Sequence, residues 1–99
     1  RIFPKSHQPY FERASREILR GTAELLQRVF LRMGERLGDP DNHFFIHTPP
    51  LKDQNSYRHY HWHIEINPKI NIPGGFEVST GVDVIEVAPE ETAALLRVK

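Results

Sequence analysis

The chain has 99 residues, enough for a single domain with a modest hydrophobic core. Its 13 basic and 13 acidic residues balance, so charge indicates neither a polyanion-binding surface nor an acidic tail. The absence of cysteine excludes a disulfide framework and thiolate zinc sites, and no apolar run reaches the length of a membrane span. We expect a cytoplasmic protein whose partners include neither nucleic acid nor a membrane.

The opening residues 1–4 have the composition of a strand end, and the proline-containing residues 4–9 that follow are typical of a turn or loop. The chain starts without methionine and inside this expected strand. We therefore interpret residues 1–99 as one truncated domain of a longer protein.

A long helix is the next expected element. Ser15 is its predicted N-cap, Leu37 its approximate end and Gly38 its stop, and apolar residues recur between them with the helical period. Arginines and glutamates interleave on the outer face. This mixed charge favours a solvated helix face over a nucleic-acid interface.

Two short segments carry most of the histidines. Residues 43–48 form an expected strand bounded by prolines, and residues 59–66 alternate strictly between polar and apolar side chains, as a half-buried strand does. A solvated sheet face would account for one histidine. A row of three that ends in a carboxylate instead indicates a metal site or acid–base chemistry. The row consists of His59, His61, His63 and Glu65.

The last third of the chain is mixed in character. Residues 51–58 form a polar loop, residues 76–79 and 82–87 have the composition of strands, and Pro89 is suited to open a closing helix. Arg97 and Lys99 at the end of that helix complement its dipole. The fold class expected is α+β: an antiparallel sheet, a long helix on one face, the histidines on the other, and a short C-terminal helix.

Several motifs occur in an order and spacing that together are specific. They are Ile2-Phe3-Pro4-Lys5-Ser6-His7, Gly38-Asp39-Pro40-Asp41-Asn42, Ile46-His47-Thr48-Pro49-Pro50, Tyr60-His61-Trp62-His63-Ile64-Glu65-Ile66-Asn67-Pro68 and Gly74-Gly75-Phe76-Glu77-Val78-Ser79-Thr80-Gly81. With these residues the chain resembles, over essentially its whole length, the C-terminal repeat of galactose-1-phosphate uridylyltransferases. That family consists of two-repeat members of the histidine-triad superfamily.

The resemblance implies a ping-pong transfer in which a histidine takes the uridylyl group from UDP-glucose and passes it to galactose 1-phosphate. It also implies UDP-hexose and hexose 1-phosphate as ligands, the N-terminal half of the same enzyme as a partner, and a homodimer. The family's nucleophile lies in a His-Pro-His-Gly-Gln motif that this sequence lacks. We therefore expect the fragment alone to be inactive.

Two sets of site residues follow from the resemblance. In some members histidines matching His47, His61 and His63 bind zinc or iron with a carboxylate from the other half, and Glu65 is a candidate for that carboxylate or for a residue supporting it. The glycine-rich segment matches the part that contacts the sugar phosphate; a plain hairpin turn is the alternative. Its expected substrate-binding residues are Gly75, Phe76, Glu77, Val78, Thr80 and Gly81.

Two other functions stay open. A one-repeat histidine-triad nucleotide hydrolase or transferase would use His59, His61 and His63 as its triad, with His61 as the nucleophile. Against it, Tyr57-Arg58 stands where a glutamine is expected, and the chain continues well past the triad. A non-catalytic metal-binding module, completed by a partner, is the third possibility.

Overall fold

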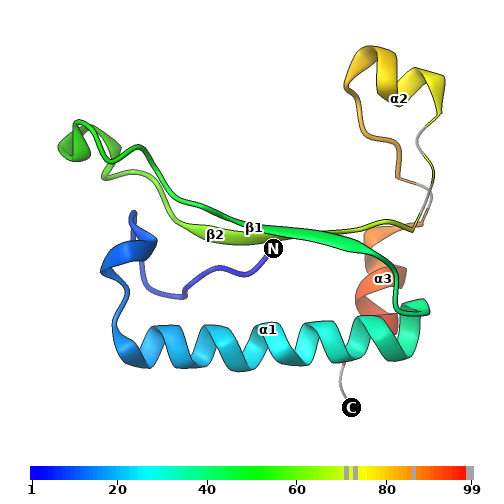
Figure 1. Cartoon of the computed structure of the whole chain (residues 1–99), viewed down its shortest axis with the longest axis horizontal. Coiled ribbons are helices and arrows are strands. Elements are labelled where there is room, and N and C mark those ends of the chain that lie inside the picture. The colour runs from blue at the N-terminus through cyan, green and yellow to red at the C-terminus, as the bar shows by residue number, and fades with distance from the viewer. Residues whose placement is uncertain (71, 73, 86, 98–99) are drawn as a thin grey trace.

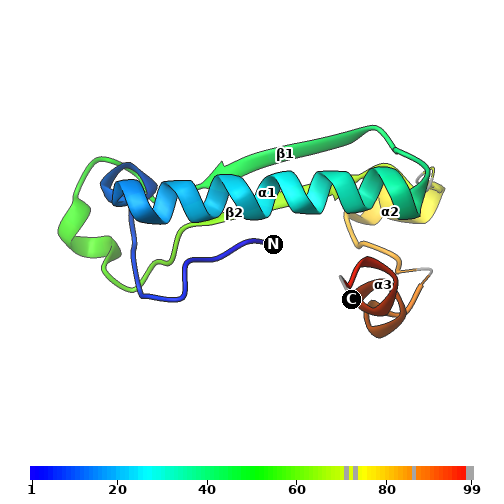
Figure 2. The same cartoon turned by 90° about the horizontal axis from the view of Figure 1, so that it is seen from below.

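A long helix lies along a two-stranded antiparallel sheet in the computed structural model, which describes residues 1–70, 72, 74–85 and 87–97 (Figure 1). The order of elements is η1 (Phe11–Arg13), α1 (Arg16–Leu37), β1 (Asn42–His47), η2 (Gln54–Tyr57), β2 (His63–Pro68), α2 (Gly75–Thr80) and α3 (Pro89–Leu96). Seen from below, α1 runs along the length of both strands (Figure 2). The expected α+β class is confirmed.

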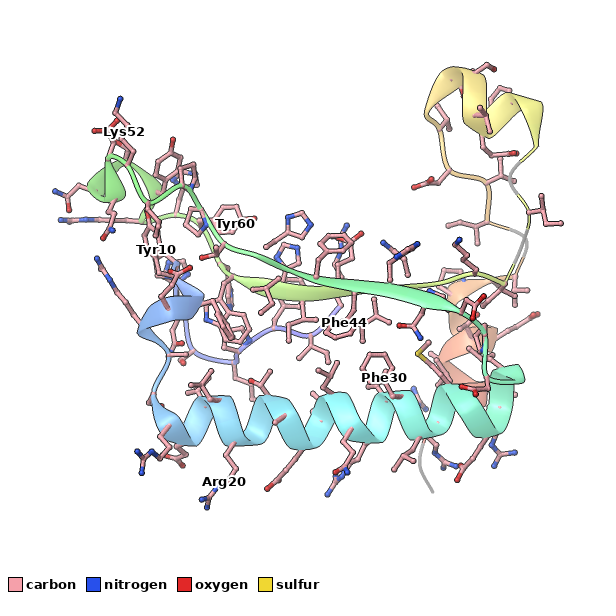
Figure 3. The ribbon with its side chains drawn as sticks, in the orientation of Figure 1. Tyr10, Arg20, Phe30, Phe44, Lys52 and Tyr60 are labelled. Atoms are coloured by element: carbon pink, nitrogen blue, oxygen red, sulfur yellow. The ribbon has the colours of Figure 1, made fainter. Side chains whose placement is uncertain are left out.

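Helix α1 has the predicted ends. The Ser15 hydroxyl accepts a hydrogen bond from the Ile18 backbone N–H at 3.2 Å, which satisfies one of the free donors of the first turn. Gly38 closes the helix with φ 75°, a left-handed conformation that glycine adopts without strain. The arginine-bearing outer face points away from the sheet, as Arg20 illustrates in Figure 3. Among the described residues, no helix is both long and apolar enough to cross a membrane.

The sheet has a register that separates apolar from polar side chains. Phe44 pairs with Ile66 and Ile46 with Ile64, so these residues share the face turned toward α1. Residue Ile2 adds a bridge to the other edge of β2, through N–H···O bonds of 2.8 and 2.9 Å with Ile64. Residues 1–4 were expected to end a strand; the structure gives a single bridge at Ile2 and no strand in these residues.

The predicted start of the second strand is wrong. Strand β2 begins at His63, four residues later than the alternation indicated, because η2 and a following turn occupy the chain up to Tyr60. The Tyr60 N–H bonds the Tyr57 carbonyl at 3.0 Å, and the Trp62 N–H bonds the Gln8 carbonyl at 3.0 Å. The backbone N–H groups of residues 60 and 62 are therefore already bonded, one within the turn and one to the N-terminal segment, and cannot extend the pairing of β2 with β1.

The core lies between the sheet and α1 and is centred on Trp62, which is fully buried. Ile2 and Ile64 complete the buried cluster, and residues of η1 and α1 pack against it. Phe11 meets the Trp62 ring edge-on at 5.1 Å. Further along, Phe30 of α1 and Phe44 of β1 point toward one another with ring centroids 5.3 Å apart (Figure 3). The apolar face of the alternating segment is thus the core face, as predicted.

Tyr10 joins the N-terminal segment to the loop between the strands. Its side chain is 4% exposed, and its hydroxyl donates a hydrogen bond of 2.7 Å to the Pro50 carbonyl. Burial raises the pKa of the Tyr10 phenol, and the nearby guanidinium of Arg13 partly opposes that shift. Arg13 also lies over the Tyr10 ring and donates to the Gln54 side chain in η2. This loop, expected to be polar, contains a short 3-10 helix.

The glycine-rich segment forms helix α2, so the strand predicted for residues 76–79 is wrong. The Glu77 carboxylate accepts the Gly74 N–H, and the hydroxyl of Thr80 donates back to the Phe76 carbonyl at 2.6 Å. Gly81 ends the helix with φ 71°. Among the described residues no strand pairs with this segment, and these local bonds satisfy its backbone instead. No strand forms in residues 82–85 or at residue 87 either.

Helix α3 opens at Pro89 with Glu90 and Glu91 in its first turn, as predicted. It contacts the end of α1, where the Arg32 guanidinium donates to the Arg97 carbonyl at 3.2 Å. Arg97 is its C-cap residue, and Lys99 lies outside the described residues.

Candidate metal site and adjoining groove

Two histidines and a glutamate converge on the sheet face turned away from α1. His47 at the end of β1 pairs directly with His63 at the start of β2, and Glu65 follows two residues later on the same face. The Nε2 atom of His47 lies 3.6 Å from Oε2 of Glu65, and the Nε2 atom of His63 lies 4.0 Å from the same oxygen. Among the described residues this is the group whose ligand atoms lie within 4.8 Å of one another and suit a metal ion.

The donor set fits zinc or iron. Two ligands of a tetrahedral ion, each about 2.1 Å from the metal, lie about 3.4 Å apart, near the separations found here. Imidazole nitrogen and carboxylate oxygen are both ordinary ligands of these ions. His63 Nδ1 lies 3.3 Å from the His61 carbonyl, which can only accept. A bond of this kind uses Nδ1 as the donor, which leaves Nε2, on the side of Glu65, as the nitrogen of His63 that would bind a metal ion.

His61 lies outside this group. Its Nε2 donates a hydrogen bond of 2.8 Å to the Pro4 carbonyl, and its ring meets those of Phe3 and His7 edge-on at 5.7 and 5.5 Å. His59 is exposed in the turn before β2. Of the row of histidines read from the sequence, the structure therefore brings His63 to His47 and holds His61 against the N-terminal segment.

Arg1 is a member of the site that no sequence pattern indicates. Its Nε lies 3.4 Å from Glu65 Oε2, the oxygen that both histidines approach. The Ile2–Ile64 bridge fixes the register of this segment, so Arg1 lies alongside Glu65. Glu65, by contrast, is detectable in the sequence, because the strand alternation puts it on the face of His63.

A groove of about 1070 Å³ adjoins Glu65 and extends toward α2. Its walls come from the end of β2, the following segment and the start of α2, with Asp83 and Val84 beyond. Glu77 and Gly74 line it directly. The other residues expected to contact substrate lie on α2 itself or at its cap; Phe76 and Val78 are 58% and 75% exposed. The groove thus runs from the metal-binding group to the glycine-rich segment.

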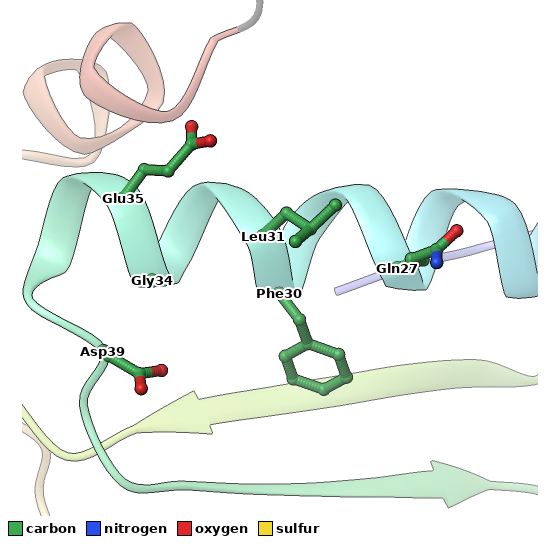
Figure 4. A pocket seen from close by; sticks show the side chains of 6 residues that line it. All are labelled: Gln27, Phe30, Leu31, Gly34, Glu35 and Asp39. Carbon is green, nitrogen blue, oxygen red and sulfur yellow. The ribbon is translucent and has the colours of Figure 1, made fainter.

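A second hollow lies beside the C-terminal half of α1, with a volume of about 560 Å³ (Figure 4). Phe30 and Leu31 provide its apolar wall, and Glu35 and Asp39 lie at its margin. The two carboxylates stand on opposite sides of the helix in Figure 4 and form no joint binding site.

Comparison with profiles of protein families gives no match. ADP-glucose phosphorylase of Arabidopsis thaliana is 34% identical over 97 residues, covering 97% of this chain and 28% of that protein. The crystal structure of an ADP-glucose phosphorylase from the same plant with bound ADP-glucose superposes with a TM-score of 0.84 at 31% identity, over 96% of this chain and 31% of that one. The X-ray structure of an Arabidopsis GalT-like protein gives a TM-score of 0.84 at 33% identity, over 96% and 32%.

The fold and the histidine-bearing strand define an α+β domain of the histidine-triad type. More narrowly, the chain belongs to the GalT-like family, the galactose-1-phosphate uridylyltransferase branch of that superfamily. The family resemblance read from the sequence is confirmed. The chain spans about 28% of the length of the curated relative it matches.

Proposed function

We propose that this segment is one domain of a longer nucleotidyltransferase or phosphorylase that acts on a nucleoside diphosphate sugar. The observation that carries the proposal is the 34% identity to an ADP-glucose phosphorylase across 97% of the chain. The superposed crystal structure of such a phosphorylase has ADP-glucose bound. ADP-glucose is therefore the first donor to test, with UDP-glucose, which the sequence resemblance implies, as the second.

The proposed chemistry is a two-step displacement. A histidine elsewhere in the longer protein attacks the α-phosphorus, and glucose 1-phosphate leaves with the electrons of the broken P–O bond. An acceptor oxygen then attacks the same phosphorus and releases the histidine. With phosphate as acceptor the product is the nucleoside diphosphate, whereas with galactose 1-phosphate it is a new nucleotide sugar.

Within that enzyme we propose that this domain holds a zinc or iron ion through His47, His63 and Glu65. The support is the convergence of their ligand atoms within 4.8 Å. An ion there would supply a cross-link between the ends of β1 and β2. His61, expected from the sequence to be a ligand, would have to give up its bond to the Pro4 carbonyl to join the set.

We further propose that the α2 segment contributes the sugar-phosphate contacts. The support is the groove that joins Glu65 to Gly74 and Glu77. The Gly75 N–H, in the first turn of α2, is the donor that a phosphate or a sugar would use, whereas the Thr80 hydroxyl and the Gly81 N–H would first have to give up their bonds to the Phe76 and Glu77 carbonyls. The exposed apolar side chains Phe76 and Val78 suit a homodimer contact over the same segment.

The test uses the whole protein that contains this sequence. It is incubated with ADP-glucose or UDP-glucose, labelled in the α-phosphate, and then given phosphate or galactose 1-phosphate. We expect an acid-labile nucleotidyl–histidine adduct that the preferred acceptor discharges. Failure of both donors to label the protein would contradict the proposal. Labelling that His61→Gln abolishes would favour the one-repeat histidine-triad enzyme instead.

A further inference from the structure

We propose that Arg1 is a built-in counter-ion that competes with the metal ion for Glu65. This inference rests on the metal site proposed above. Arg1 Nε, His47 Nε2 and His63 Nε2 all approach one oxygen, Glu65 Oε2, at 3.4, 3.6 and 4.0 Å. A metal ion held between the two imidazoles and Oε2 of Glu65 would therefore bind an oxygen that already faces a guanidinium.

The geometry favours competition over support. At 3.4 Å the Arg1–Glu65 pair is longer than the about 2.7–3.2 Å of a normal N–H···O hydrogen bond, so it neutralises the carboxylate without fixing its orientation. A guanidinium is permanently charged. It repels a divalent ion that shares its oxygen, and the metal can bind fully only when the arginine moves aside.

The backbone around Arg1 allows this movement. The Ile2–Ile64 bridge and the bond from His61 to the Pro4 carbonyl hold the segment in place, and both engage its main-chain atoms. The Arg1 side chain is 60% exposed, so water can receive it when it leaves Glu65. Without metal, Arg1 offsets the charge of a carboxylate whose side chain is 23% exposed. With metal, the ion takes over that role.

The experiment measures the zinc affinity of the whole protein that contains this sequence, by competition with a chromophoric chelator. Arg1→Gln should bind zinc about fivefold more tightly than wild type, the size of one partly exposed charge interaction. The advantage should shrink at high salt, because such a pair is screened. Arg20→Gln, the same change on the outer face of α1, should leave the affinity as in wild type.

Equal zinc binding by Arg1→Gln would overturn the inference, and weaker binding would overturn it and show that Arg1 supports Glu65 instead. The proposed metal site would then still stand, since wild type binds. Zinc binding by Arg1→Gln but not by wild type would support the inference in its strongest form. If neither protein binds zinc at neutral pH, the inference and the proposed metal site both fail.

Discussion

His63 lies directly across from His47 in the β1–β2 register, and their rings stack with centroids 4.7 Å apart and planes 15° apart. Directly opposed residues of an antiparallel pair bring their side chains closest together. The relationship therefore places two imidazoles from strands that are distant in sequence at one end of the sheet. Glu65 then supplies the carboxylate from the same face.

Zinc should stabilise the folded chain through this pair. A ligand that binds the folded state alone adds about 2.7 kcal/mol when its free concentration is 100 times its Kd. We expect zinc to raise the Tm of wild type, and the rise should vanish on acidification, because protonated imidazoles cannot bind metal. His63→Ala should lose the rise. His43→Ala is the matched control and should keep the rise, because His43 lies on the same face of the sheet, four residues before His47 in β1.

Trp62 should dominate the stability of the fold. Its side chain is fully buried and its Nε1–H donates to the Gln8 side chain at 3.3 Å. We expect Trp62→Ala to cost about 3–5 kcal/mol in free energy of unfolding, because it leaves a large cavity. Trp62→Phe should cost less and remain measurable by urea denaturation. Leu31→Ala, at a side chain 61% exposed, should change little, and an equal loss there would contradict this account of the core.

The Tyr10 phenol should make stability fall at alkaline pH. Because burial raises its pKa above the unfolded value of about 10, the folded state holds this proton more tightly. The contribution is complete below the unfolded pKa and is lost as pH rises through the folded one. Ultraviolet titration of phenolate should show a step above the ordinary tyrosine range in wild type. That step should be absent in Tyr10→Phe and present in Tyr57→Phe.

The 99-residue chain should show no nucleotidyl transfer of its own. It lacks the His-Pro-His-Gly-Gln motif of the family, and covalent catalysis requires a nucleophile held at the α-phosphorus. Incubation with α-labelled ADP-glucose or UDP-glucose should leave the chain unlabelled. A stable adduct on the isolated chain would show that a histidine within these residues is the nucleophile, with His61 the first to substitute.

The long helix and the division of each strand into an apolar and a polar face were predictable from local pattern. Ser15 and Gly38 mark the ends of α1 through their own capping chemistry, and alternation assigned Trp62 and Ile64 to the core. The start of β2 was not predictable, because the Gln8 carbonyl and the η2 turn, which take the donors of residues 60 and 62, are set by tertiary contacts.

The helical conformation of α2 was also not predictable from the sequence. Its valine, phenylalanine and threonine favour strands, but in the part of the chain that the structure describes no strand pairs with them, and the Glu77 carboxylate supplies a local cap. In the metal-binding group, the alternation indicated a shared face for His61, His63 and Glu65. It could not show that Pro4 would bind His61, or that Ile2 would bring Arg1 to Glu65, because both depend on the bridge between Ile2 and Ile64.

The central claim is that His47, His63 and Glu65 together hold a metal ion. The most direct measurement is the metal content of the chain, purified without chelator at neutral pH, in wild type and three variants. We predict about one zinc or iron ion per chain in wild type, nearly full content in His61→Ala, and loss in both His63→Ala and Glu65→Ala. Loss in His61→Ala with retention in Glu65→Ala would contradict the account and show that His61, not Glu65, is the third ligand.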